Sequence, residues 1–437
     1  MNGLLKKGII LHHIDQDIKI IELLGSGGQG EVYKVEYNNK HYALKWYFPD
    51  TATPEQKKIL EDLILKKQPN ENFLWPILLV ESEEFNSFGY LMELRTKEYK
   101  GIVDLMKNKC SPSFYNLATV GFHTSNSFLQ LHSRGLCYKD ISFGNLFFNP
   151  NNGDVKICDN DNVTPDAQDF SGVLGTPKFM APEIVRGDRK PSTQTDLYSL
   201  AILLFYVFFV HHPLDGSLEM KIKCMDAPAM KKLYGDDPIF IFDPNNSSNR
   251  PVKGEQDNAL IYWSIYPQFF KDLFIKSFTD GIHDPLNGRV RESEWRNIFI
   301  KLRDSIFYCE CGAENFYDLD SIKANQGTAN ACWSCNKIPT LPYRMKINNS
   351  ILMINYNTKF YPHHIDPQRK YELIDPIAEV STHPQDPTIW GIKNLSKEKW
   401  VMTDKAGNLN EVVPGKNCKI ENGIKINFGS SEGEIKY

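Results

Sequence analysis

The sequence has 437 residues, of which 41% are hydrophobic and 24% are charged. This composition is typical of globular proteins with a buried core, and the length predicts two or three domains. The net charge of −4 excludes the overall basic field that drives non-specific nucleic-acid binding, so nucleic acid is not an expected partner.

Membrane insertion is also not expected. The longest apolar run, residues 200–210, has eleven residues, whereas a membrane span needs about 20. We predict that this run is a buried helix of a large domain. The apolar stretch near the N-terminus is too short for a signal peptide. We therefore expect a cytoplasmic protein whose nine cysteines stay reduced.

The first 95 or so residues are predicted to form a small antiparallel sheet with one helix. A helix is expected after Pro54, because apolar residues there follow helical spacing and proline suits a first helical turn. Segments rich in β-forming residues are found at 18–24, 31–37, 40–48 and 90–94.

Helical patterns dominate from Tyr115 to about Phe307. A short, polar, cysteine-bearing segment follows at 308–340. From about residue 342 to the end, short β segments alternate with Asn, Gly and Pro, which predicts an all-β sandwich or barrel.

A glycine motif lies between the first two predicted strands. Its glycines are Gly25, Gly27 and Gly30, followed by Val32. Dinucleotide-binding folds use the same spacing but continue into a helix, whereas here a second strand is predicted. A P-loop is excluded because its Gly-Lys-Ser/Thr sequence is missing. The motif therefore predicts a hairpin tip whose bare backbone can lie over phosphates, and an ordinary glycine-rich hairpin is the alternative.

Further motifs follow in a fixed order along the chain. They are Ala43-Leu44-Lys45, Asp140 with Asn145 five residues later, Asp159 at the end of an apolar strand, the segment 175–183 (GTPKFMAPE), and Asp196. Over residues 15–305 this set resembles the protein kinase-like family. The resemblance implies a bilobal α+β domain, ATP as cofactor, and Mg²⁺ or Mn²⁺ as metal.

The resemblance also implies roles for individual residues. Lys45 would pair with the ATP phosphates, Asp159 and Asn145 would hold the metal, and Asp140 would accept the proton of the substrate hydroxyl. A carboxylate of the helix after Pro54 would hold Lys45; Glu61 is the first candidate. The fallback candidates are Glu55 and Asp62.

The adenine site would be lined by residues of the first lobe. Met92 would lie at its back, and the backbone of Glu93 and Arg95 would hydrogen-bond adenine. The remaining nucleotide-binding residues are Gly25, Gly27, Gly30, Val32 and Ala43.

Three structural contacts are expected in the second lobe. Glu183 would pair with Arg289, and Asp196 would cap the backbone of the catalytic loop. Thr176 would link the catalytic loop to the peptide-binding segment, which suits serine/threonine specificity.

The sequence departs from the family pattern near the expected catalytic residues. Tyr138 and Lys139 replace His-Arg, Ser142 replaces a lysine, and Asp159-Asn160-Asp161 replaces Asp-Phe-Gly. A nucleotide-binding pseudokinase scaffold is therefore the main alternative, and a small-molecule kinase is a further one. Thr164 and Ser171 are candidate autophosphorylation sites, or plain loop hydroxyls.

Four cysteines form two close pairs separated by twenty residues. They are Cys309, Cys311, Cys332 and Cys335. This spacing is typical of a zinc ribbon, in which four thiolates make a closed, structural Zn²⁺ site. Unligated thiols or an iron–sulfur cluster are the alternatives.

The sequence predicts three domains. They are a kinase domain at 1–307, with lobes at about 15–95 and 96–307, a zinc-ribbon segment at 308–340, and a β domain at 341–437. The last is loosely similar to forkhead-associated modules and equally compatible with an OB-like barrel. This domain order resembles bacterial Ser/Thr kinases encoded beside a von Willebrand A-type TerY-like protein and a metal-dependent phosphatase, which implies those two proteins as partners besides the protein substrate.

Overall fold

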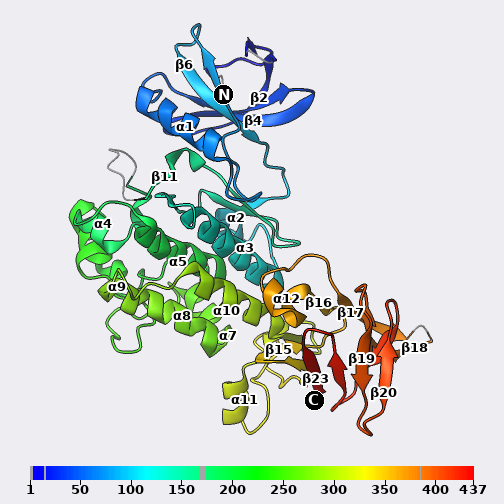
Figure 1. Ribbon diagram of the computed structural model, residues 1–437. Helices are drawn as coiled ribbons and strands as arrows, with labels where there is room; N and C mark the ends of the chain where they lie inside the picture. The colour runs from blue at the N-terminus through cyan, green and yellow to red at the C-terminus, as the bar shows by residue number, and fades with distance from the viewer. Residues whose placement is uncertain (1–2, 14–15, 167–173, 384) are drawn as a thin grey trace. The chain divides into compact units, whose positions relative to one another are not determined.

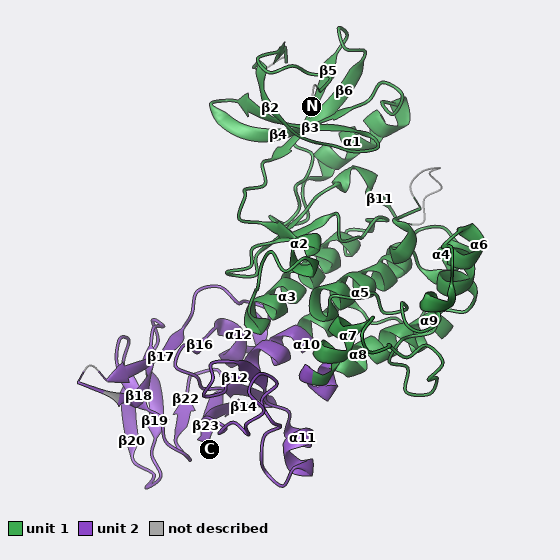
Figure 2. Ribbon diagram, turned by 180° about the vertical axis from the view of Figure 1, so that it is seen from behind, with its two compact units in different colours: residues 1–264, 271–297 green, residues 265–270, 298–437 purple. Residues whose placement is uncertain are grey.

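The computed structural model describes the chain apart from residues 1–2, 14–15, 167–173 and 384 (Figure 1). It contains two compact units, coloured separately in Figure 2. Unit 1 comprises residues 1–264 and 271–297, and unit 2 comprises residues 265–270 and 298–437. None of the described helices is both long enough and apolar enough to cross a membrane.

Unit 1 begins with a six-stranded antiparallel sheet of order β1-β2-β3-β4-β6-β5. Its strands are β1 (Ile10–Leu11), β2 (Ile18–Ser26), β3 (Gly30–Tyr37), β4 (Lys40–Tyr47), β5 (Leu78–Ser82) and β6 (Ser87–Glu93). Tyr33 and Val35 alternate with less buried neighbours along β3 and pack against Trp46. This period-two burial is the pattern of a strand with one face on a core. The four strands expected from the sequence are confirmed.

Helix α1 (Pro54–Lys66) follows β4, as the sequence predicts (Figure 1). The Thr53 hydroxyl caps it by accepting a hydrogen bond from the Gln56 backbone N–H, and Pro54 occupies the first turn. Leu60 and Leu63 form its buried face.

From residue 102 to residue 304 the chain is mainly helical. The α-helices are α2 (Ile102–Met106), α3 (Phe114–His132), α4 (Pro182–Arg186), α5 (Thr193–Phe209), α6 (Ala227–Lys231), α7 (Asp257–Ile265), α8 (Gln268–Phe278), α9 (Asp280–His283) and α10 (Glu292–Asp304). Three short 3₁₀ helices are η1 (Asn160–Asn162), η2 (Pro177–Phe179) and η3 (Glu219–Lys221), and η4 (Lys232–Asp236) is a short π-helix. Helix α5 contains the long apolar run and is buried from Thr195 to its end, which confirms the predicted buried helix.

Five short strands support the loops of this helical part. They are β7 (Lys100–Gly101), β8 (Leu136–Cys137), β9 (Leu146–Phe148), β10 (Val155–Ile157) and β11 (Thr164–Pro165). The β9–β10 hairpin separates Asn145 from Asp159, so that both residues lie at the same end of one hairpin.

Unit 2 contains a small hairpin and two further sheets. The hairpin is β12 (Ile306–Tyr308) with β13 (Glu314–Phe316), followed by α11 (Leu319–Ala324). One sheet has the order β15-β14-β23-β22-β19-β20, and the other has the order β16-β17-β18-β21. The bounds are β14 (Arg344–Ile347), β15 (Ser350–Met353), β16 (Lys359–Phe360), α12 (Pro362–Ile365), η5 (Pro367–Arg369), β17 (Ala378–His383), β18 (Asp386–Asn394), β19 (Trp400–Thr403), β20 (Leu409–Val412), β21 (Asn417–Lys419), β22 (Lys425–Asn427) and β23 (Glu432–Lys436).

The two sheets of unit 2 share one hydrophobic core. Met345 and Ile435 from the first sheet and Phe360 and Ile392 from the second belong to the same buried cluster, with Trp400 inside it. Two sheets that share a core form a sandwich rather than a single closed barrel. Additional β structure at the C-terminal end is therefore confirmed.

Candidate active site

The glycine motif forms the tip between β2 and β3. A Cβ atom added at Gly25 or Gly27 would meet no atom within 4 Å, whereas at Gly30 it would lie 2.1 Å from the Trp46 carbonyl oxygen. Gly30 is thus required for packing, while the other two glycines leave the backbone of the hairpin open. In the register of the sheet, Val32 on β3 lies opposite Lys45 on β4.

Lys45 is buried and surrounded by oxygen atoms. Its Nζ lies 2.8 Å from Oδ2 of Asp161, 3.3 Å from Oδ1 of Asp159 and 3.2 Å from Oε1 of Gln29. Burial alone disfavours the ammonium form, but the two carboxylates outweigh it and raise the pKa of Lys45. The lysine is therefore charged and held in place by its neighbours.

The predicted pairing of Lys45 with a helix carboxylate requires a correction. Glu61 is exposed to solvent, as are the fallback residues Glu55 and Asp62. Among the described residues, the ion pairs of Lys45 are with Asp159 and Asp161. Helix α1 turns Leu60 and Leu63 inward, so these three carboxylates lie on its outer side.

The side chain that α1 directs at the site is Gln56. Its Nε2 donates a hydrogen bond to the backbone carbonyl of Asp161 at 2.9 Å and lies 3.2 Å from the hydroxyl of Tyr47. Neither Gln56 nor Asp161 is among the site residues predicted from the sequence. The available signal is Asp161 itself, an acid two residues after Asp159.

The loop from Asp159 to Asp161 is fixed by its second and third residues. Asp159 has a left-handed backbone, with φ of 54° and ψ of 43°, a conformation that is uncommon for residues other than glycine. Asn160 is buried, and its Nδ2 donates to the carbonyl oxygens of Leu74 at 2.9 Å and Ile157 at 3.0 Å. These bonds tie the loop to two segments of the surrounding backbone.

Asp161 is completely buried and accepts hydrogen bonds from several side chains. Its Oδ2 accepts from Lys45 and from the Tyr47 hydroxyl, and its Oδ1 lies 3.3 Å from the Tyr90 hydroxyl. Burial would raise the pKa of this carboxyl, but Lys45 and Tyr47 stabilise the carboxylate and lower the pKa. Asp161 is therefore ionised in the folded protein.

Asp140 lies in a second loop, where Thr176 orients its carboxylate and Asn145 holds its backbone. The Thr176 hydroxyl donates to Oδ1 at 2.7 Å, and Nδ2 of Asn145 donates to the Asp140 carbonyl at 2.9 Å. Asp196 accepts hydrogen bonds from the backbone N–H groups of Tyr138 at 2.6 Å and Lys139 at 3.0 Å. The predicted capping of this loop by Asp196 is confirmed.

The predicted pair of Glu183 and Arg289 is also confirmed. Nη2 of Arg289 lies 2.8 Å from both carboxylate oxygens, and both side chains are buried. The pair fixes the start of α4 and hence the end of the segment that contains Thr176.

The residues predicted to surround adenine lie where β6 ends. Met92 is buried opposite Ala43 in the sheet. The Glu93 carboxylate accepts from Lys156 at 3.0 Å, and the Arg95 guanidinium stacks 3.8 Å from the Phe147 ring centroid. The two side chains are thus engaged elsewhere, so the predicted contact through their backbone atoms requires no rearrangement of the side chains. Nucleotide binding here stays a prediction.

The two candidate phosphorylation sites differ in what can be said of them. Thr164 lies in β11 with 2% of its surface exposed, so its hydroxyl is not accessible in this conformation. Ser171 lies outside the described residues.

The four clustered cysteines of unit 2 converge on one point. The sulfur of Cys309 lies 3.6 Å from that of Cys335, the sulfur of Cys311 lies 3.8 Å from that of Cys332, and all four lie within 4.8 Å of one another. Four sulfurs at about 2.3 Å from a tetrahedral zinc ion are roughly 3.8 Å apart. The donor set therefore fits Zn²⁺.

One of these thiols is tuned by its surroundings. Burial opposes ionisation of Cys332, but backbone N–H groups and the amide of Asn315, 3.5 Å from the sulfur, lower its pKa to about 6. Hydrogen bonds to a thiolate of this kind support a metal-binding sulfur.

A second group of possible metal ligands consists of Asp304, His363 and His364. Nδ1 of His364 accepts a hydrogen bond from the Tyr361 backbone N–H at 2.8 Å, so the proton of the neutral ring is on Nε2. That Nε2 donates to Asp304 at 3.1 Å. His364 and Asp304 therefore form a buried hydrogen-bonded pair.

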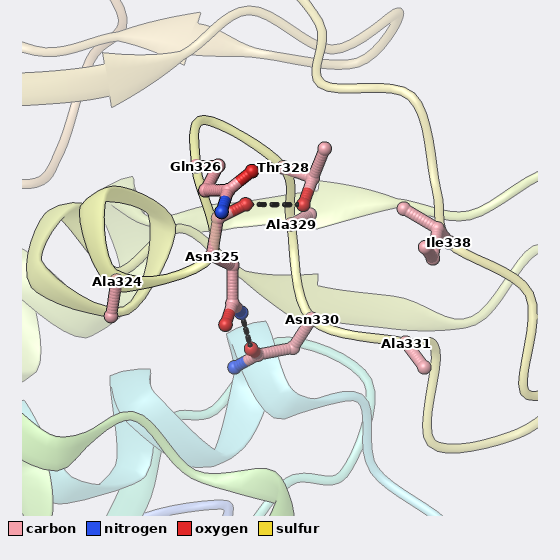
Figure 3. Close-up of a pocket in the computed structure, with 8 residues that line it drawn as sticks. All are labelled: Ala324, Asn325, Gln326, Thr328, Ala329, Asn330, Ala331 and Ile338. Carbon is pink, nitrogen blue, oxygen red and sulfur yellow. Dashed lines mark hydrogen bonds between the residues drawn. The ribbon is translucent and has the colours of Figure 1, made fainter.

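Figure 3 shows a cavity of about 410 Å³ close to the cysteines in sequence. Its lining residues are Ala324, Asn325, Gln326, Thr328, Ala329, Asn330, Ala331 and Ile338. Asn325 and Asn330 hydrogen-bond each other at 2.6 Å across it. No lining residue is an acid, base or thiol, so the cavity offers no catalytic chemistry.

Comparison with known proteins identifies the class of the first unit. The family model described as "Protein kinase domain" matches residues 18–261, which is more than half of the chain. The chain therefore belongs to the protein kinase domain family.

The curated relatives are serine/threonine-protein kinases of low identity. CLA4 of Candida albicans is 27% identical over 195 residues, covering 42% of this chain and 19% of that protein. TIO of Arabidopsis thaliana is 27% identical over 206 residues, covering 45% and 15%. CBL-interacting serine/threonine-protein kinase 2 of the same plant is 25% identical over 252 residues, covering 52% of each chain.

The matched region thus spans between about a seventh and half of these relatives. These relatives are all serine/threonine-protein kinases, and the region they share with this chain falls within or overlaps the part that the family model matches.

Proposed function

We propose that this chain transfers the γ-phosphate of ATP to serine or threonine hydroxyl groups of a protein substrate. The observation that supports this most is the oriented carboxylate of Asp140. It accepts a hydrogen bond from Thr176 and lies on a loop that Asp196 caps. A carboxylate held in this way can orient a substrate hydroxyl and accept its proton.

The donor set at the loop ends fits Mg²⁺ and ATP. Asp159 offers a carboxylate whose side chain is 45% exposed, and Asn145 keeps its amide oxygen available because Nδ2 is the atom that binds Asp140. Oxygen donors of this kind suit Mg²⁺, which neutralises phosphate charge when bound. Lys45 would hold the phosphates beneath the glycine hairpin, and Glu93 and Arg95 would bind adenine through their backbone.

A pseudokinase scaffold is the competing function. Ser142 is buried at the position where the family pattern has a lysine, so one cation near the phosphate is missing. The retained acids Asp140 and Asp159 favour turnover over a purely structural role.

Labelled-ATP transfer in the presence of Mg²⁺ or Mn²⁺ tests the proposal. We expect phosphoserine or phosphothreonine on the chain itself or on a generic protein substrate. Asp140→Ala and Asp159→Ala should each reduce the rate by at least roughly a hundredfold, the scale of general-base catalysis. Nucleotide-dependent thermal stabilisation without transfer would establish the scaffold instead, and no nucleotide binding would contradict both.

We further propose the domain organisation 1–307, 308–340 and 341–437, with a structural Zn²⁺ site in the second segment. The four converging sulfurs support the metal. Unit 2 has two separate sheets around one core, which favours the forkhead-associated-like alternative over an OB fold, a single five-stranded barrel. We assign it a docking role.

The resemblance in domain order supports a bacterial phosphosignalling setting in the cytoplasm, with a TerY-like protein and a metal-dependent phosphatase as partners. Co-purification of these two proteins with the full chain, and loss of that binding when residues 341–437 are removed, would support the assignment. Unchanged binding after the truncation would contradict the docking role.

A further inference from the structure

We propose that Asp161 is the positioning carboxylate of Lys45, in place of a glutamate from helix α1. The inference rests on the proposed function, because Lys45 needs a fixed position only if it holds a nucleotide. Its basis is the arrangement of Asp161, Lys45 and Gln56.

Asp161 has the surroundings of a permanent anchor. It is 0% exposed, and both oxygens of its carboxylate are engaged: one by Lys45 at 2.8 Å and by Tyr47, the other by Tyr90 at 3.3 Å. A buried carboxylate with all its partners in place is rigid, and losing it would leave a buried ammonium without its nearest counter-charge. Asp159, by contrast, has a side chain that is 45% exposed and lies farther from Lys45, at 3.3 Å. The two acids can thus have separate roles: Asp161 holds the lysine, and Asp159 is available to bind a metal.

Helix α1 contributes to this arrangement through an uncharged group. Gln56 donates to the backbone carbonyl of Asp161 and reaches the hydroxyl of Tyr47. The Gln56 amide therefore holds the Asp161 backbone in place, while Glu61 on the same helix faces solvent. Helix α1 therefore influences the position of Lys45 only through the loop that contains Asp161.

The closeness of these two acids in the chain bears on how the activity could be controlled. Asp159 and Asp161 flank Asn160 in one tight turn, η1, so the residue for the metal and the residue for the lysine move together. Any partner that shifts this turn would disable both contacts at once. In a kinase whose lysine partner lies on a helix, those two contacts can be broken separately.

The test compares substitutions at Asp161 in the full chain, with kcat, KM for ATP and the dissociation constant of Mg-ATP measured for each. Asp161→Asn keeps the size of the side chain and should lower kcat/KM for ATP by roughly tenfold or more, with most of the loss in kcat, because a misplaced lysine fails most at the transferring phosphate. Asp50→Asn makes the same chemical change at an exposed site and should match the wild type.

A rescue experiment separates positioning from simple structural damage. Asp161→Gly restores the residue of the family pattern and should be as impaired as Asp161→Asn. Adding Gln56→Glu to Asp161→Gly returns a carboxylate from the helix side and should recover a substantial part of kcat. Gln56→Glu in the otherwise unchanged chain should not raise kcat, because Asp161 already holds Lys45.

Several outcomes would overturn the inference. Asp161→Asn with unchanged kinetics would do so, as would a loss with Glu61→Gln equal to that with Asp161→Asn. If the wild type binds Mg-ATP without transferring phosphate, the proposed function fails, but weaker Mg-ATP binding by Asp161→Asn would still support the anchor. If the wild type does not bind Mg-ATP at all, both proposals fail. If the Asp161→Asn protein does not fold, the double variant with Gln56→Glu and Asp161→Gly provides the test. Failure of that double variant to recover kcat counts against the proposal.

Discussion

At the scale of single residues, the candidate site depends on short contacts between side chains far apart in sequence. The Thr176 hydroxyl reaches Asp140 across 36 positions. A hydroxyl that donates to a carboxylate both orients it and stabilises its charge. The bond therefore connects the catalytic loop to the segment expected to receive the substrate.

Substitutions of Thr176 test how much this hydrogen bond contributes to kcat. Thr176→Val removes the donor but keeps the shape, and we expect a fall in kcat on the order of tenfold, the effect of losing one hydrogen bond to a charged group. Thr176→Ser keeps the hydroxyl and should retain most of the rate. Steady-state transfer assays on both variants check this, and equal rates for the two would contradict an orienting role.

The sequence predicted the candidate residues of the site but not the carboxylates that pair with Lys45. Lys45, Asp140, Asn145 and Asp159 could be located because their order and spacing follow a known pattern. The partner of Lys45 could not, because Asp161 is 116 positions away and reaches the lysine only after the sheet and the loop are folded. The apolar spacing of the helix places Glu55, Glu61 and Asp62 away from its buried face, but it does not show which other segment supplies a partner for Lys45.

At the scale of elements, three helices meet at one buried histidine. His132 ends α3, and its Nε2 lies 3.1 Å from Asp196 on α5 while its Nδ1 bonds Glu292 at the start of α10. Burial would lower the pKa of His132, but the two carboxylates outweigh this and raise it to about 9. The cation therefore joins three helices beneath the catalytic loop that Asp196 caps.

The stability of the protein should reflect this histidine in alkaline solution. A folded pKa of about 9 against the ordinary value of 6.5 means that the stabilisation is complete below pH 6.5 and lost as pH rises through 9. The difference corresponds to roughly 3 kcal/mol of unfolding free energy. Urea unfolding between pH 6 and pH 10 should show this decline, and His132→Gln should flatten it. An unchanged slope in the variant would contradict the assignment.

Strands and helices were predictable from the sequence where its pattern of β-forming or apolar residues was strong. Four strands of the first sheet were predicted from segments rich in β-forming residues, and helix α5 was predicted from one long apolar run. Strands β1 and β5 of the same sheet were not predicted. Strands of two to five residues contain too few alternations to reveal a period, and their existence depends on neighbours that pair with them.

At the scale of the whole molecule, unit 2 combines a short cysteine-bearing segment with a β sandwich. The segment between the two cysteine pairs contributes few buried residues, among them Ile322 and Ala329, to a small cluster that it shares with Phe307 and Met353. A structural metal adds most where a core is small. Bound zinc should therefore hold this segment together.

Metal analysis and chelation test this expectation. We expect about one zinc ion per chain by elemental analysis, lost on treatment with a strong chelator or in Cys332→Ser. The loss should expose residues 309–335 to proteolysis and lower the melting temperature of unit 2. Cys224→Ser removes an exposed thiol outside the cluster and should leave metal content and melting unchanged. Full metal content in Cys332→Ser would contradict a four-cysteine site.

Asn160 has a consequence for inhibitor chemistry. In the family pattern a phenylalanine occupies this position, and its ring donates no hydrogen bond to the surrounding backbone. Here, turning the loop over would remove the Asn160 hydrogen bonds from two carbonyls. The Leu74 carbonyl would be left unpaired, at about 1–3 kcal/mol, whereas the Ile157 carbonyl would keep its bond from the Leu74 backbone N–H. The vacated space would also be lined with these polar acceptors. Selective ligands for this protein should therefore present an amide-like donor pair to that space rather than an aromatic ring.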